Sequence, residues 1–144
     1  MNPTSADVRD LAERLTDATR HDDVDTLAAL LASIVDRNAV LAEFYEPVLA
    51  KFVVDVARTL RYRFGDEDAD NVFTVDLMDG QENPVAIDEL DPALRAVLRA
   101  VLAQLNGDDD DARFQLSLVE ADPEPLSRLD ALWHVLLWSV VFED

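Results

Sequence analysis

Residues 91–107 read DPALRAVLRAVLAQLNG, and this stretch decides the fold class. Asp91 is a preferred N-cap residue, and Pro92 suits the first helical position because an amide hydrogen there would have no partner inside the helix. Apolar residues then recur at the 3.6-residue period that places them on one face of a helix: Leu94, Val97, Leu98, Val101, Leu102 and Leu105. Asn106 and Gly107 are residue types that end helices. The stretch therefore predicts an amphipathic helix with a buried face.

Two more helices are predicted near the N-terminus. Within residues 5–20, apolar residues fall at i, i+3, i+4 and i+7: Val8, Leu11, Ala12 and Leu15. Thr4 or Ser5 provides the cap for this helix. Asp23 then caps a second helix, which extends to about residue 36. The apolar face of the second helix consists of Val24, Leu27, Leu31, Ile34 and Val35.

A third helical region is predicted over residues 38–64. Its apolar stripe is continuous: Val40, Leu41, Phe44, Val48, Phe52, Val56 and Leu60. Pro47 lies within this region, and a proline in a helix interior costs about 3 kcal/mol because it removes a hydrogen bond and clashes with the preceding turn. We therefore expect either a kink at Pro47 or two helices that meet near Glu46. Gly65 is a stop signal for the region.

A small β-hairpin is predicted near residues 72–87. Residues 71–77 read NVFTVDL, a short run rich in residues that favour strands. Asp79 and Gly80 form a turn signal, and residues 84–87 return as a second short strand. An isolated hairpin is only marginally stable, so we expect it to pack against the helices.

The C-terminal third begins with an ambiguous segment, residues 112–119. Its residues at 114, 116 and 118 alternate like a strand, whereas those at 112, 116 and 119 have helical spacing. The preceding acidic run at residues 108–111 supplies caps and first-turn acids, which favours a short helix. Residues 122–125 read DPEP, a helix-start signal like that of Asp91 and Pro92. A last helix follows from about residue 126 to 142, and it is apolar on most sides.

A helix that is apolar all round, such as this last one, either lies at the centre of a core or is covered by a partner.

The whole chain, residues 1–144, is predicted to be one acidic domain of ordinary size. The predicted fold is mainly α: a single-domain bundle of five or six helices with the small hairpin near residues 72–87.

The charge balance restricts the classes of partner. Asp and Glu total 31 against 12 Lys and Arg, which gives a net charge of −19 at pH 7. Such a field disfavours direct binding to nucleic acid or anionic membranes, and it favours basic protein surfaces. Biased genome composition or adaptation to salt would also produce such a charge. There is no cysteine, no secretory signal, and no apolar run near the roughly 20 residues of a membrane span, so a cytoplasmic protein is expected.

One segment partly matches a calcium-binding loop. Asp66, Asp68 and Asp70 occupy the first, third and fifth positions of an EF-hand loop. However, Asn71 stands where the sharp turn needs glycine, and Leu77 stands where a bidentate glutamate should complete the site. These three aspartates are weak metal candidates, and a solvated loop is the simpler interpretation. No metal or other cofactor is predicted.

Catalytic patterns have little support. His21 and Asp22 form the residue pair found in metal-dependent phosphohydrolases, but such sites need further histidines and His134 is the only other one. There is no cysteine and no G-x-S-x-G sequence, and three separated glycines cannot form a phosphate-binding loop. We therefore expect a protein that is not an enzyme.

The favoured function is a protein-interaction module, an adaptor, a regulator or a homo-oligomer. Its partner-binding candidates in the last helix are Trp133, Leu137, Trp138 and Val141, and homodimerisation through this helix is the simplest version.

The main alternative is an acidic protein that mimics nucleic acid or neutralises a basic partner, as immunity proteins do. It would act through carboxylates that include Asp108, Asp109, Asp110 and Asp111. A mimic needs its carboxylates in a line on one face, whereas compositional acidity spreads them evenly. A metal-binding protein that uses the loop at residues 66–70 is the remaining alternative.

Overall fold

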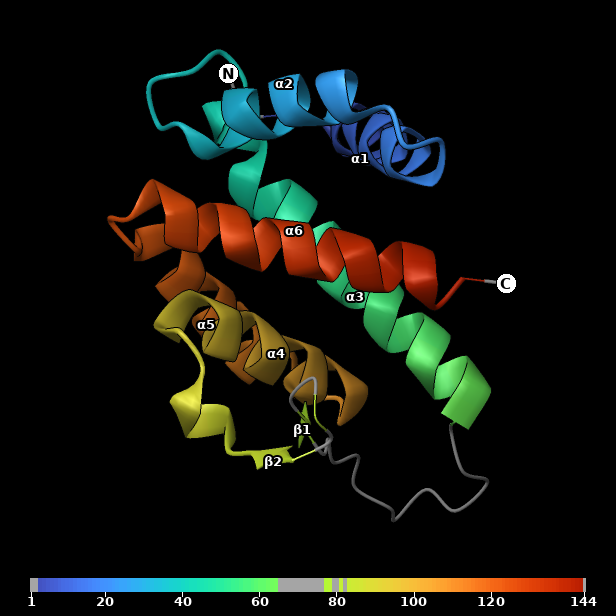
Figure 1. Cartoon of the computed structure of the whole chain (residues 1–144), viewed down its shortest axis with the longest axis vertical. Helices are drawn as coiled ribbons and strands as arrows, with labels where there is room; N and C mark the ends of the chain where they lie inside the picture. The colour runs from blue at the N-terminus through green and yellow to red at the C-terminus, as the bar shows by residue number, and fades with distance from the viewer. Residues whose placement is uncertain (1–2, 65–76, 79–80, 82, 144) are drawn as a thin grey trace.

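The protein is mainly α-helical, as predicted (Figure 1). The computed structural model describes residues 3–64, 77, 78, 81 and 83–143. Within them lie six α-helices: α1 (Ser5–Arg20), α2 (Val24–Val35), α3 (Tyr45–Phe64), α4 (Pro92–Leu105), α5 (Asp109–Ala121) and α6 (Pro125–Val141). Two short 3₁₀ helices, η1 (Ala42–Phe44) and η2 (Ile87–Glu89), precede α3 and α4.

Most helix ends follow the local signals in the sequence. Thr4 and Asp7 form a reciprocal capping box, in which each side chain accepts the other residue's amide hydrogen. The Asp23 carboxylate accepts the amide hydrogen of Thr26 at 3.3 Å and thereby caps α2. Gly107 has a φ of 77°, the left-handed conformation that glycine adopts without strain, and this allows the short turn between α4 and α5.

The predicted kink at Pro47 is absent, because α3 begins at Tyr45 and places Pro47 in its first turn. The first amide groups of a helix have no intrahelical partner, so proline there removes no hydrogen bond. Of the two predicted arrangements, the second is correct: two helices, η1 and α3, meet near Glu46. The helical prediction for residues 38–41 was wrong, since they form turns, and Val40 is 94% exposed instead of buried.

The hairpin is present but short. Strand β1 (Leu77–Met78) pairs antiparallel with β2 (Pro84–Val85), and Leu77 lies opposite Val85. The rest of the first predicted strand, residues 71–76, lies outside the described residues. The second predicted strand is shorter than expected because Ile87 begins η2. The ambiguous segment at residues 112–119 is helical and belongs to α5.

Helix α6 lies at the centre of the packing and contacts all five of the other helices. Figure 1 shows it crossing the molecule, with α1 and α2 on one side and α4 and α5 on the other. The largest fully buried side chains come from α1, α2, α3 and α6: Phe52, Leu15, Ile34, Leu49, Leu132 and Leu136. Burial of each contributes roughly 1.5–3 kcal/mol. None of the described helices is long and apolar enough to cross a membrane.

Candidate functional site

Helix α6 has a buried inner side and an apolar outer side. The inner side consists of fully buried residues: Ala131, Leu132, Val135 and Leu136. Because an α-helix turns about 100° per residue, four apolar residues lie on the opposite side: Leu126, Trp133, Leu137 and Val141. We call these four residues the outer stripe. Leu126 is 75% exposed and Val141 is 62% exposed, whereas Trp133 and Leu137 are partly buried.

The two tryptophans predicted as partner-binding residues occupy different positions. Trp133 belongs to the outer stripe and also packs at its edge against the core. Trp138 is one residue past Leu137, about 100° further around the helix, and it is a partly buried residue packed on the core. The His134 and Trp138 rings form a T-shaped contact, with ring centroids 6.1 Å apart and planes inclined by 63°. Trp133, Leu137 and Val141 therefore share one side of α6, and Trp138 does not.

Asp130 places a carboxylate within the outer stripe. It is exposed, and it lies four residues after Leu126 and three before Trp133. Within the described part of the chain no cation pairs with this carboxylate. The backbone carbonyl of Asp130 lies 2.7 Å from Nδ1 of His134. Since a carbonyl oxygen only accepts, Nδ1 carries the proton in this contact.

The acidic run at residues 108–111 serves the start of α5. Asp108 caps the helix by accepting the Asp111 amide hydrogen at 3.1 Å. Asp110 forms an ion pair with Arg113 at 2.9 Å. The carboxylates of Asp109 and Asp111 accept hydrogen bonds from nearby glutamine side chains. All four therefore have local contacts, and acids in the first turn also suit the helix dipole.

Beyond this run, α5 has an exposed apolar pair that was not predicted from the sequence to lie at the surface. Phe114 is 57% exposed and Leu118 is 47% exposed, and their i, i+4 spacing makes them neighbours on the outer side of α5. The helical register of Ala112, Leu116 and Val119, which are buried, would have placed this pair outward. The strand-like alternation of the segment obscured that signal.

A buried polar network fixes the start of α6. Arg128 is only 2% exposed, and its guanidinium donates to the carbonyl of Val35 at 2.6 Å and to that of Asp122 at 2.7 Å. Tyr45 lies beside it, with the guanidinium 6.0 Å from the ring centroid, and its hydroxyl donates to the Arg128 carbonyl at 2.7 Å. Burial raises the pKa of Tyr45 above its ordinary value, and the nearby Arg128 charge opposes this effect.

A second arginine joins the same corner. Arg37 donates to the carbonyls of Glu120 and Asp122, at 2.8 and 2.9 Å. The two arginines thus satisfy carbonyl groups that the ends of α2 and α5 leave without helical partners. This network was not predicted from the sequence, although Arg128 is the only Lys or Arg within α6.

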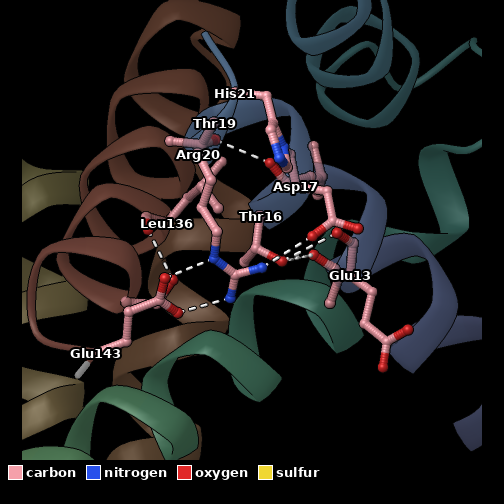
Figure 2. A network of polar contacts seen from close by, with 11 residues as sticks. Glu13, Thr16, Asp17, Thr19, Arg20, His21, Leu136 and Glu143 are labelled. Atoms are coloured by element: carbon pink, nitrogen blue, oxygen red, sulfur yellow. Dashed lines mark hydrogen bonds and ion pairs between the residues drawn. The ribbon is translucent and has the colours of Figure 1, made fainter. Parts of the chain in front are cut away.

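A further ion pair connects the end of α1 to the end of the described chain. Figure 2 shows the Arg20 guanidinium between Asp17 and Glu143. It donates to both carboxylate oxygens of Glu143, at 2.5 and 2.6 Å, and to Asp17 at 2.8 Å. The hydrogen bonds from Arg20 lower the pKa of Glu143. The pair holds the C-terminal end of α6 against α1.

The cavity and the possible metal sites give weaker support for a functional site. A cavity of ≈ 540 Å³ lies between the starts of α1 and α3, and two cations line it. Both already have acidic neighbours, since Lys51 pairs with Asp55 at 2.9 Å and Arg9 lies 3.8 Å from Asp10. Among the described residues, no group of three His, Cys, Asp or Glu side chains could hold a metal ion. The weak candidates Asp66, Asp68 and Asp70 lie outside the described residues.

Comparisons with protein-family models, with curated proteins and with solved structures find no match for this chain.

Proposed function

We propose that this chain is a non-catalytic protein-interaction module that binds its partner through the outer stripe of α6. The observation that carries the proposal is the presence of exposed leucine and valine on the side of α6 that faces away from the core. The inner side supplies the fully buried residues of α6, and Trp133 and Leu137 are partly buried. Leu126 and Val141 stay exposed, so core packing does not account for these two apolar residues. Apolar groups gathered on an exposed side commonly mark a contact surface.

The spacing of the stripe suits recognition of another helix. Partner helices insert anchors at i, i+3, i+4 and i+7 into the complementary surface, and Trp133, Leu137 and Val141 follow one another at intervals of four residues. Trp133 is a residue type that often dominates binding energy when a partner covers it. A stable contact buries about 800 Å² on each partner, so residues that flank the stripe must contribute too.

The distribution of carboxylates favours this proposal over nucleic-acid mimicry. Exposed acids occur on α1, on α2, in the first turn of α5 and around the α5–α6 connection. Those at residues 108–111 make contacts within their own region of the chain. A mimic needs carboxylates that are aligned and available on one face. The carboxylates of this protein are spread over several elements, which favours the interaction module over a mimic.

The proposal is tested by affinity capture with matched variants. Leu137→Ser removes an apolar anchor from the outer stripe, whereas Val24→Ser removes a 68% exposed valine from the start of α2. Circular dichroism first establishes that both variants fold. We expect a protein captured by the wild type and by Val24→Ser to be lost with Leu137→Ser. Equal capture by both variants, or capture of nothing by the wild type, would contradict the proposal.

A further inference from the structure

The partner of the outer stripe can be described from charge, and this inference rests on the function proposed above. Between residues 108 and 143 the chain has nine acidic residues, two arginines and no lysine. Arg128 is buried and bonded to carbonyl groups, and Arg113 is paired with Asp110. This part of the chain therefore offers carboxylates, and no free cation, to an approaching surface.

Asp130 determines where on the partner a cation is required. A partner that covered the outer stripe with apolar groups alone would bury an unpaired carboxylate, which is strongly unfavourable. A cation on the partner, placed within its apolar side, offsets that cost. Trp133 lies three residues after Asp130 on the same side of α6, and tryptophan is the side chain that attracts cations most strongly through its π electrons.

A second copy of this chain does not meet the requirement. It would bring another net charge of −19 and a second Asp130 toward the same surface. The long-range repulsion between two such chains opposes their encounter at low ionic strength. Anionic membranes are disfavoured for the same reason.

The shape of the stripe suits a single helix. The fifteen residue steps from Leu126 to Val141 correspond to roughly 22 Å along the helix axis, at about 1.5 Å per residue. One helix of about four turns can pack along this length. We propose that the outer stripe of α6 binds a cationic amphipathic helix that carries an arginine or lysine within its apolar side, opposite Asp130.

The test uses a synthetic 18-residue amphipathic peptide with leucines on one side, lysines on the other and one arginine in the middle of the leucine side. A second peptide replaces only that central arginine with glutamate. Binding is measured by fluorescence anisotropy at about 0.15 M salt, where the Debye length of about 8 Å suppresses remote charge effects.

The protein variants are Asp130→Asn and Asp25→Asn, which remove one exposed carboxylate each and so have the same net charge. We expect Asp130→Asn to weaken binding of the arginine peptide five- to tenfold, and Asp25→Asn to change it less than twofold. The glutamate peptide should bind the wild type at least tenfold more weakly. Equal losses for both variants, or equal affinity for both peptides, would overturn the inference.

Two further outcomes separate this inference from the proposed function. If both peptides bind equally and Leu137→Ser weakens both, the stripe is a contact surface but its partner is not defined by a central cation. If Leu137→Ser changes neither the binding of the two peptides nor the affinity capture, the proposed function itself fails. A dimer seen by light scattering and abolished by Leu137→Ser would identify the occupant as a second copy, and this too would overturn the inference.

Discussion

At the scale of single residues, Arg128 shows how a charged group can be buried in this protein. A buried cation usually needs a carboxylate, but this guanidinium donates to the carbonyls of Val35 and Asp122, at the ends of α2 and α5. Those groups carry the negative ends of two helix dipoles and lack other helical partners. One side chain thereby connects α2, the α5–α6 connection and α6.

Replacing Arg128 should therefore be costly. Arg128→Met removes two charge-assisted hydrogen bonds, each worth about 1.5–3 kcal/mol, and we expect the free energy of unfolding to fall by about 3 kcal/mol or more. Urea denaturation followed by circular dichroism provides the measurement. Arg113→Met is the control, because Arg113 is 77% exposed and forms only a surface ion pair. A similar small loss for both variants would refute the structural role of Arg128.

Tyr45 makes a prediction at alkaline pH. Since its folded-state pKa is raised above the ordinary value of about 10, its contribution to stability is fully present below pH 10. That contribution is lost as the pH rises toward the folded-state pKa. In a Tyr62→Phe background, where Tyr45 is the only tyrosine, phenolate absorbance should appear only together with unfolding. Absorbance that rises near pH 10 while the circular dichroism stays native would contradict burial of this hydroxyl.

At the scale of elements, local signals predicted most helices and tertiary contacts explain the rest. The capping residues Thr4 and Asp23, the Asp91–Pro92 start and the Gly107 stop are readable because each acts on its own turn of backbone. Spacing did not separate the buried side of α6 from its outer stripe, because the helix is apolar on most sides and exposure depends on which neighbours cover it. The contacts of Arg128 were unreadable, since they join segments far apart in the sequence.

Pro47 tests the boundary of α3. In the first turn it disturbs no helical hydrogen bond, so Pro47→Ala should lower the free energy of unfolding by no more than about 1 kcal/mol, through the greater freedom of the unfolded chain. If Pro47 instead interrupted a longer helix, its replacement would stabilise the protein by about 3 kcal/mol. Chemical denaturation distinguishes the two, because the expected changes have opposite signs.

At the scale of the whole molecule, Arg20 and Glu143 connect α1 to the far end of the chain. Both side chains are about 40% exposed, so the pair contributes at most about 1 kcal/mol. The pKa of Glu143 is lowered in the folded state from its ordinary value of 4.5, so this contribution is present above that pH and is lost as the pH falls through the folded-state pKa.

Thermal melts of Glu143→Gln should therefore differ from those of the wild type at pH 7, where the variant melts lower. The difference should shrink as the pH falls below 4. Glu120→Gln is the control, since the contact of Glu120 with Arg37 uses its backbone carbonyl. A difference between Glu143→Gln and the wild type that persisted unchanged at pH 2 would show that the carboxylate charge is not the source of the stabilisation.

This acidic bundle is proposed to bind a partner through the outer side of α6. The most direct measurement is an NMR titration of the ¹⁵N-labelled protein with the arginine peptide. We predict that the largest chemical-shift changes occur at Asp130, Leu137, Val141 and the indole N–H of Trp133, with little change on α1 and α2. Changes spread over the carboxylate-rich turns of α1, α2 and α5, with α6 unaffected, would contradict the claim and leave only general attraction between opposite charges.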